Sequence, residues 1–255
     1  MRDWPRPLIL AHRGASAHAP ENTLAAFELA LAQGAHGVEL DVKLSADEEV
    51  VVIHDATVDR TTGGKGRVSQ LTLTALRELD AGSFFSAEFS AEKIPALAEV
   101  FDAIGERAYI NVELTNYTTP RDGLADKVCN LVKQFGLEER ILFSSFLPWN
   151  LKRTRSLLPG IPRGLLALGG WVGWWARSFG FNFGDYLALH PHLRDVTPQQ
   201  IVRVHRLKRY INVYTVNLVE DMRRLINWGV DGIITDEPKL AKEIIAEKHD
   251  SLQMA

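Results

Sequence analysis

Acidic residues alternate with aliphatic ones in the short segment VELDV, residues 38–42. Side chains point alternately to the two faces of a strand, so Glu39 and Asp41 would share one face and the aliphatic residues the other. The same alternation recurs in YINVEL, residues 109–114, where Glu113 is next to last. Carboxylates held side by side repel each other. Either a bound cation offsets this repulsion, or the acidic face is simply solvated.

Two histidines and an arginine stand at the ends of other strand-like segments. His12 ends the segment LILAH and Arg13 follows it, while His54 ends VVVIH. Histidine serves as a general acid or base near neutral pH, and the planar guanidinium group of arginine suits a phosphate oxyanion. Each residue alone also has a structural interpretation, because His-Arg-Gly is a common kind of turn. Asp55 and Asp59 are expected to be turn or cap residues.

Strand-like and helical segments alternate along the chain. Helical patterns include PENTLAAFELALAQG, in which Pro20 suits a first turn and Gly34 a C-terminal cap. Such alternation indicates a parallel sheet, and eight or nine repeats over 255 residues favour a closed α/β barrel. The expected strands are residues 8–12, 37–42, 50–54, 109–114, 140–145, 163–168, 185–190, 210–216 and 231–235.

Two connections depart from the regular alternation. Only KLSADEE separates the second expected strand from the third, which is too short for a parallel crossover, so we expect a hairpin there. Residues 56–94 carry turn signals, aromatic residues and one helical run, and we expect them to form a small cap beside the barrel mouth. The sequence therefore predicts a single, somewhat irregular TIM-type (β/α)8 barrel domain over residues 1–255, with this insertion after its third strand.

The carboxyl ends of barrel strands, with the loops that follow them, form the active site of such a fold. This rule gathers six side chains at one mouth: His12, Arg13, Glu39, Asp41, His54 and Glu113. Three carboxylates without cysteine form a hard oxygen site, which suits Mg²⁺ or Ca²⁺ better than zinc. A divalent cation, an arginine and two histidines together favour hydrolysis of a phosphate ester, with the metal and arginine stabilising the charged transition state.

Composition and charge argue against several other classes of protein. The chain is 46% hydrophobic and 24% charged, as ordinary globular proteins are, and its net charge of -3 argues against a nucleic-acid partner. A single cysteine, Cys129, excludes an internal disulfide and a thiolate metal cluster, and its surroundings predict a buried helical residue. The N-terminal segment has only a short apolar run, so we expect neither a signal peptide nor a membrane span, and a cytoplasmic location.

At these motifs the sequence resembles the glycerophosphodiester phosphodiesterase family, which belongs to the same broad barrel class as phosphatidylinositol-specific phospholipase C. The resemblance spans nearly the whole chain. It begins with AHRGASAHAPENTLAAFELALAQGAHGVELDV and VVIHDATVDRTTGGKG, and continues through IPALAEVF, SSF, YTVN and GVDGIITDEP. It implies a hydrolase of lipid and glycerol metabolism that releases an alcohol from a glycerophosphodiester and leaves glycerol 3-phosphate.

The resemblance also implies roles for individual residues. His12 and His54 would be the acid and base, with their order left open, and Arg13 would lie beside the phosphate. Glu21, from the PENT motif, would support the loop after the first strand rather than bind metal. The divalent cation would be held by three carboxylates, Glu39, Asp41 and Glu113.

Two positions differ from the usual family pattern, and both bear on substrate binding. Many family members carry a lysine two residues after the metal-binding glutamate, where this chain has Thr115. Arg13 and the metal would then hold the phosphate, helped by Thr115 or by Lys43, which shares the alternation of the two acidic residues on its strand. Tyr214 stands where the family usually has tryptophan, so an aromatic wall of different shape is expected.

The segment GGWVGWWARSFGFNF follows the sixth expected strand and places Trp171, Trp174 and Trp175 on one helical face. One interpretation is a helix packed by this face against the outside of the barrel. The other is an aromatic lip that contacts a lipid chain or a membrane interface, which would favour lysophospholipids and make the protein a lysophospholipase D. A third alternative, a barrel that binds phosphodiesters without cleaving them, has no need of two proton-transfer groups.

Overall fold

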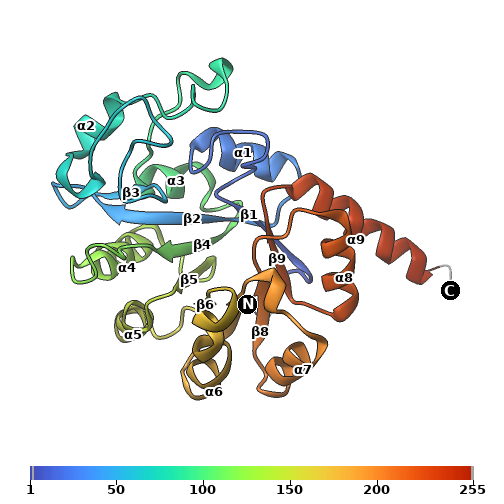
Figure 1. The fold of residues 1–255 in the computed structure, drawn as a ribbon. Helices are drawn as coiled ribbons and strands as arrows, with labels where there is room; N and C mark the ends of the chain where they lie inside the picture. Colours follow the sequence, from blue (N-terminus) through green and yellow to red (C-terminus); the bar gives the residue numbers. More distant parts are fainter. Residues whose placement is uncertain (2, 254–255) are drawn as a thin grey trace.

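A computed structural model describes residues 1 and 3–253, the last five of these by their backbone only. Within these residues, eight parallel strands close into a barrel, as predicted (Figure 1). Each strand pairs with the next around the ring, and the last pairs back with the first. In ring order they are β1 (Leu8–His12), β2 (Gly37–Leu44), β4 (Tyr109–Leu114), β5 (Ile141–Ser145), β6 (Arg163–Ala167), β7 (Ala188–Pro191), β8 (Tyr210–Val213) and β9 (Gly232–Thr235).

Helices lie around the outside of this ring, mostly one between each pair of strands (Figure 1). They are α1 (Leu24–Ala32), α2 (Leu73–Glu78), α3 (Leu97–Ile104), α4 (Leu124–Phe135), α5 (Pro148–Leu157), α6 (Phe181–Phe183), α7 (Pro198–Arg206), α8 (Val219–Trp228) and α9 (Pro238–Gln253). Among the described residues, no helix is both long enough and apolar enough to cross a membrane.

The first helix starts later than predicted, because a side-chain cap fixes its beginning. The hydroxyl oxygen of Thr23 accepts a hydrogen bond from the backbone N–H of Ala26, which is the usual N-cap arrangement, so α1 begins at Leu24. Pro20 therefore lies before the helix rather than in its first turn. Gly34 follows the helix with φ +90°, a left-handed conformation that favours glycine, as the C-terminal prediction required.

The third expected strand is an antiparallel addition to the ring. β3 (Val50–Val52) pairs with β2 in the predicted hairpin, with Val42 opposite Val52. It ends two residues earlier than predicted, so His54 lies in the loop after the strand. The segment that follows holds α2 and a small apolar cluster of its own, formed by Val51, Ile53, Val58, Val68, Leu76, Ala81 and Ile94.

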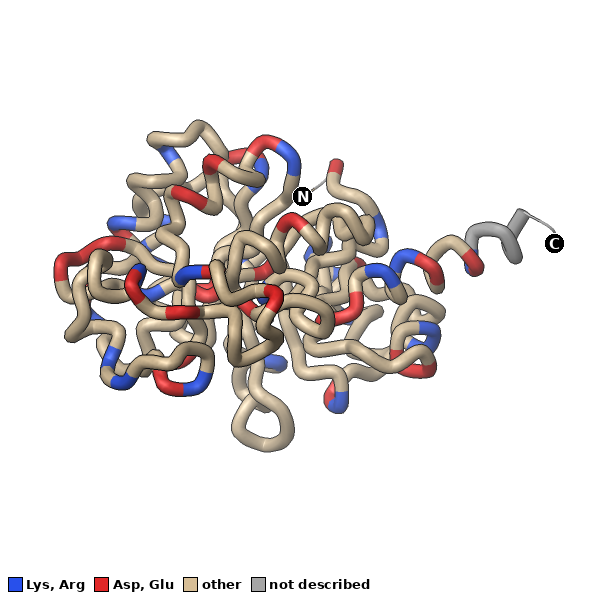
Figure 2. Tube along the Cα trace, turned by 90° about the horizontal axis from the view of Figure 1, so that it is seen from above, with Lys and Arg blue, Asp and Glu red and all other residues tan. Residues whose placement is uncertain are grey.

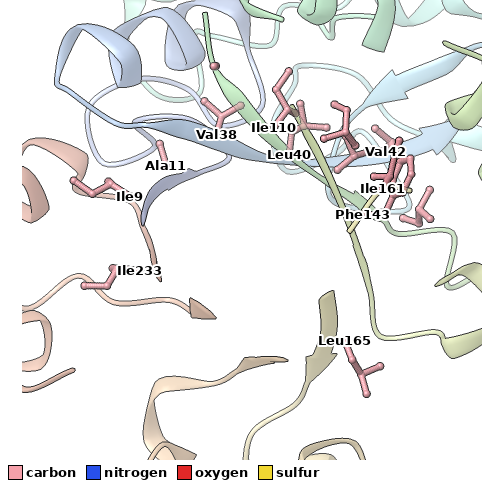
Figure 3. Close-up of a cluster of buried hydrophobic side chains, with 14 of the residues drawn as sticks. Ile9, Ala11, Val38, Leu40, Val42, Ile110, Phe143, Ile161, Leu165 and Ile233 are labelled. Atoms are coloured by element: carbon pink, nitrogen blue, oxygen red, sulfur yellow. The ribbon is translucent and has the colours of Figure 1, made fainter. Parts of the chain in front are cut away.

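Side chains alternate along each strand between the layer under the helices and the inside of the barrel. Outward-facing aliphatic side chains such as Val38, Leu40 and Ile110 pack between the strands and the helices, as Figure 3 shows. Inside the barrel, a second cluster fills the end opposite the mouth: Trp4, Leu8, Leu10, Leu142 and Ile234. The inward positions nearer the carboxyl ends of the strands are left to polar side chains. This division places the predicted site above an apolar floor.

Candidate active site

The three predicted carboxylates meet at the mouth of the barrel. Glu39 and Asp41 project from β2, and Glu113 projects from β4, whose register places it directly opposite Asp41. Each residue offers an oxygen that lies within 4.8 Å of an oxygen of the other two. Glu39 and Asp41 are buried, whereas Glu113 is partly exposed. The parallel pairing of β2 with β4 thus brings together residues that are far apart in sequence.

The charges of these carboxylates are mutually unfavourable. Burial, followed by the nearby charges of Asp41 and Glu113, raises the pKa of Glu39 well above its usual value. Burial and the charge of Asp41 raise the pKa of Glu113 to about 8, although the Tyr117 hydroxyl donates to its Oε1 at 2.5 Å. The Oε1 atom of Glu39 is buried and has no hydrogen-bond partner among the described residues. A hard oxygen cluster with an unpaired buried oxygen fits a divalent cation.

Arg13 lies against this cluster in a left-handed turn, with φ 57°. Its Nε lies 3.3 Å from Asp41 Oδ2, and its terminal nitrogen donates to Glu21 Oε1 at 2.8 Å. Burial opposes the charged form of Arg13, but the charges of Asp41, Glu21 and Glu39 outweigh it and raise the pKa of Arg13. Glu21 is also bound by both terminal nitrogens of Arg60, at 2.6 and 2.8 Å. Glu21 therefore contacts two arginines at the edge of the cluster.

His12 is held by a carboxylate that the sequence interpretation did not identify. Its Nδ1 lies 2.7 Å from Asp236 Oδ1, in the loop after β9. Ser16 and Asn217 also donate to Asp236, at 2.8 and 2.5 Å. Burial would raise the pKa of Asp236, but its hydrogen bond with His12 and these donors lower it. The sequence does contain a signal for Asp236, because this residue directly follows an expected strand and the end-of-strand rule used for the other site residues applies to it.

His54 has a matching arrangement. Its Nδ1 lies 2.7 Å from Asp55 Oδ1, and the Nε of Arg60 donates to Asp55 Oδ2 at 2.7 Å. The Arg60 hydrogen bond, opposed by partial burial, lowers the pKa of Asp55 to about 2. The interpretation of Asp55 as a turn or cap residue is therefore wrong, because its carboxylate binds the neighbouring imidazole. Asp59 does behave as predicted, accepting from the backbone N–H of Gly66 in a turn.

Lys43 lies on the same inward face of β2 as the two acidic residues. Its ammonium group donates to Thr115 on the neighbouring strand's loop, at 2.9 Å to the hydroxyl oxygen and 2.5 Å to the carbonyl oxygen. Burial lowers the pKa of Lys43, although the charges of Asp41 and Glu113 act in the opposite direction. The buried ammonium group of Lys43 therefore lies near the carboxylates, but its hydrogen bonds go to neutral oxygen atoms of Thr115.

Aromatic rings line another part of the mouth. The rings of Tyr117 and Phe146 lie 5.9 Å apart, and those of Phe146 and Tyr214 lie 6.2 Å apart. The Tyr214 hydroxyl donates to the carbonyl oxygen of Ala167 at the end of β6, at 2.9 Å. Tyr214 thus lies in an aromatic row that reaches Glu113 through Tyr117. Tyr117 and Phe146 were not predicted, since each is a single aromatic residue in a loop.

The tryptophan segment does not pack as a regular helix would. It forms a 3₁₀ turn, η3 (Gly170–Gly173), and a π-helical turn, η4 (Ala176–Gly180), before the short α6. The side chains of Trp171, Trp174 and Trp175 are exposed. The interpretation that they pack against the barrel is therefore wrong, because the irregular turns do not direct an i, i+3, i+4 set to one buried face.

Two of the hollows among the described residues lie at opposite ends of the barrel. One of about 260 Å³ lies at the mouth beside His12, Arg13 and Asp236. A larger one of about 600 Å³ lies at the opposite end of the barrel, beside Trp4 and Tyr109. The second is bigger but contains none of the carboxylates or histidines described above. The charged side chains therefore favour the smaller hollow as part of the candidate active site.

Comparison with known proteins agrees with this geometry. The sequence profile of the glycerophosphoryl diester phosphodiesterase family matches residues 12–240. The chain belongs to this family. It is 40% identical over 235 residues to a glycerophosphodiester phosphodiesterase of Caldanaerobacter subterraneus subsp. tengcongensis, covering 92% of this chain and 96% of that protein. It is 35% identical over 249 residues to a glycerophosphodiester phosphodiesterase of Bacillus altitudinis, covering 94% and 98%.

Solved structures of this family have the same barrel. A phosphodiesterase of Oleispira antarctica, solved in complex with the product sn-glycerol-3-phosphate, superposes with a TM-score of 0.87 at 32% identity. The match covers 94% of this chain and 97% of that one. A glycerophosphodiester phosphodiesterase of Agrobacterium tumefaciens gives a TM-score of 0.80 at 30% identity, covering 92% and 98%. Members of the glycerophosphodiester phosphodiesterase family therefore share the fold described above over nearly its full length.

The raised pKa of Glu113 makes the stability of the metal-free protein depend on pH. The folded state keeps a proton up to about pH 8 that the unfolded chain releases near its ordinary pKa of 4.5. The free energy of unfolding should therefore fall as pH rises through this window. In urea unfolding with a chelator, Glu113→Gln should weaken this decline between about pH 5 and about pH 8. An identical pH dependence in both proteins would contradict the assignment.

Proposed function

We propose that this protein hydrolyses glycerophosphodiesters to glycerol 3-phosphate and an alcohol, with a divalent cation and a histidine pair. One observation carries the proposal: a three-carboxylate cluster stands at the same mouth as two imidazoles that are each held by a carboxylate. Membership of the phosphodiesterase family supports it, as does the product complex of the Oleispira antarctica relative. Residues 1–255 would act as one barrel domain, with residues 56–94 as a cap beside its mouth.

Glu39, Asp41 and Glu113 would hold the cation, which we propose is Mg²⁺ or Ca²⁺ because all three ligands are hard oxygens. When bound, the cation would neutralise charge on the phosphate oxygens and stabilise the charged transition state. Arg13 lies beside these ligands and would present its guanidinium group to the phosphate. Its ion pair with Glu21, which Arg60 also binds, would keep the guanidinium group in place.

His12 and His54 would move the protons. A carboxylate at Nδ1 favours the tautomer with its proton on that nitrogen, so Nε2 of each imidazole is free to face the substrate. One histidine would accept a proton from the attacking water molecule, and the other would give a proton to the oxygen of the leaving alcohol. Asp236 and Asp55 would act as positioning residues, because each would affect the substrate only through the imidazole that it binds.

Two other functions compete with this one. A barrel that only binds phosphodiesters would not need two carboxylate-held imidazoles, so we favour catalysis. Activity on lysophospholipids is favoured by the exposed tryptophans, and it uses the same catalytic groups on a substrate with an acyl chain. We propose a cytoplasmic location for the activity, supported by a single cysteine that is buried in α4 and cannot form an internal disulfide.

The direct test is to incubate the protein with glycerophosphocholine, with and without EDTA, and to measure glycerol 3-phosphate and choline. We expect equal amounts of both products, no turnover with EDTA, and recovery when Mg²⁺ or Ca²⁺ is added in excess. Glu39→Gln should abolish metal-dependent turnover while leaving the folded state intact by circular dichroism. Absence of product with every divalent cation tried would favour the binding protein.

Replacing either histidine should lower kcat on glycerophosphocholine by about 100-fold to 10,000-fold, the usual contribution of a general acid or base. A glycerophosphodiester with a p-nitrophenol leaving group then separates their roles, because this alcohol leaves without being protonated. We expect either His12→Ala or His54→Ala to lose much less of its kcat on this substrate than on glycerophosphocholine. The histidine replaced in that variant is the general acid. Equal losses of both variants on both substrates would contradict the division of roles. His205→Ala, an exposed histidine on α7, is the control.

Lys43 should act as a second positive group for the phosphate. Lys43→Met should lower kcat/KM by about tenfold to 100-fold, the effect of losing one charge-assisted hydrogen bond. The double variant Lys43→Met/Thr115→Lys returns an ammonium group to the adjacent position, and part of the loss should be recovered. Lys127→Met, at an exposed lysine on α4, is the matched control. Unchanged kcat/KM in a folded Lys43→Met protein would remove Lys43 from the site.

A further inference from the structure

Exposed apolar side chains gather in the loops that follow neighbouring strands of the barrel. Trp149 follows β5 and is 51% exposed, while Trp171 and Val172 follow β6 and are 90% and 78% exposed. Leu218, after β8, is 63% exposed. Because segments after the carboxyl ends of parallel strands lie at the same end of a barrel, these residues lie toward the mouth. We call this set, with Tyr117 and Leu168, the apolar rim. Trp149, in the first turn of α5, also lines a hollow of about 470 Å³ on the outside of the barrel, with Asp185 and Tyr186.

The remaining part of the mouth is polar. The loops after β9, β1 and β3 carry Asp236, Arg13 and His54, whereas the residues of the apolar rim follow β4, β5, β6 and β8. In the ring, β9 and β1 are adjacent, and β3 pairs with β2 next to them, so these charged groups lie on one side of the mouth. The strands β4, β5 and β6 are consecutive on the other side, and the loop after β7, with Arg194 and Asp195, separates them from Leu218. Elsewhere, basic and acidic positions are interspersed around the molecule (Figure 2), but the segment 168–184 has a single charged residue, Arg177.

Aromatic contacts connect the apolar rim to the carboxylate cluster. Tyr117 donates to Glu113 through its hydroxyl group, while its ring contacts Phe146. Phe146 contacts Tyr214, whose hydroxyl group donates to the carbonyl oxygen just before Leu168. A ligand with its phosphate at the carboxylates could therefore extend along aromatic rings to the exposed residues after β6. The apolar rim is continuous with the site rather than a separate patch.

We infer that the apolar rim binds the acyl chain of a lysophospholipid whose phosphodiester group enters the polar side of the mouth. This inference rests on the proposed phosphodiesterase activity and names a substrate class for it. A single-chain glycerophospholipid has the matching division, with a charged phosphodiester at one end of its glycerol and an apolar chain at the other. Burying its chain against exposed tryptophan and valine side chains would stabilise the complex.

The reaction on this substrate balances with water alone. The oxygen of water forms a bond to phosphorus, and the phosphorus–oxygen bond to the alcohol of the head group breaks. One proton of the water passes to the histidine that acts as base, and the other histidine gives a proton to the leaving alcohol. Lysophosphatidylcholine would therefore yield lysophosphatidic acid and choline, and the acyl ester is unchanged.

A second copy of the chain is a weaker candidate for the occupant. The apolar rim borders the mouth itself, so a partner protein bound over it would obstruct the entry of substrate. An acyl chain attached to the substrate avoids this conflict, because it occupies the rim only while the phosphodiester group occupies the site. The position of the exposed residues thus favours a ligand that uses both sides of the mouth.

The test compares two substrates with the same head group: lysophosphatidylcholine, kept below its micelle concentration, and glycerophosphocholine, which lacks the acyl chain. Choline release is measured for the wild type and for Trp171→Ser/Val172→Ser. We expect kcat/KM of the double variant to fall about tenfold on lysophosphatidylcholine, the effect of losing part of the apolar contact, and to be unchanged on glycerophosphocholine.

Phe183→Ser is the matched control, because Phe183 is 84% exposed in the same segment but lies away from the mouth. It adjoins Gly184, whose carbonyl oxygen accepts from Arg209, and Arg209 directly precedes β8 at the opposite end of the barrel. The control should act on both substrates like the wild type. If Phe183→Ser lowered kcat/KM on lysophosphatidylcholine as much as the double variant does, the assignment of the acyl chain to the apolar rim would be overturned.

Other outcomes also overturn the inference. These are no turnover of lysophosphatidylcholine by the wild type, no effect of the double variant, or equal losses on both substrates. Light scattering that shows a dimer in the wild type and a monomer in the double variant would assign the rim to a second copy instead. In all these cases, turnover of glycerophosphocholine by the wild type would leave the proposed function standing. Its absence would overturn the proposed function itself.

Discussion

The repulsion between three carboxylates at one barrel mouth is the constraint around which the rest of the site is arranged. Burial raises the pKa of Glu39 and Glu113, so the site is electrostatically unfavourable without a positive charge. Arg13 and Lys43 both lie near the cluster, but each has other partners as well. An oxygen of Glu39 is left unpaired. The negative charge of the cluster thus exceeds the positive charge beside it, which makes the cluster suited to a divalent cation. A cation bound there would in turn suit the charged oxygens of a phosphate ester.

The histidines depend on a second set of carboxylates that do not join the cluster. Asp236 holds His12 and Asp55 holds His54, and each carboxylate is itself fixed by further donors. Arg60 binds both Asp55 and Glu21, so it ties the loop after β3 to the loop after β1. Carboxylates of the same type thus have different roles, because some meet other carboxylates while others meet arginine and imidazole groups.

The barrel architecture also divides the mouth by strand order. Loops after β9, β1 and β3 bring charged side chains, and the segments after β4, β5, β6 and β8 bring exposed aromatic and aliphatic ones. Exposed tryptophan is costly to keep in water, which is why an apolar surface beside a catalytic mouth indicates an apolar part of the ligand. We propose that one side of this opening carries the phosphodiester chemistry and that the other side decides the choice of substrate.

The sequence alone determined the barrel, the hairpin after β2 and the cluster of carboxylates and histidines, because strand alternation and position at strand ends are local properties of the chain. It did not determine the partners of these groups. Asp236 lies 224 residues from His12, and only closure of the ring through β9 and β1 brings them together. The sequence around Asp55 predicts a turn residue, because the contacts of Asp55 with His54 and Arg60 depend on the path of the loop. The exposure of the tryptophans was likewise decided by tertiary structure, since irregular turns replaced the regular helix that their spacing predicted.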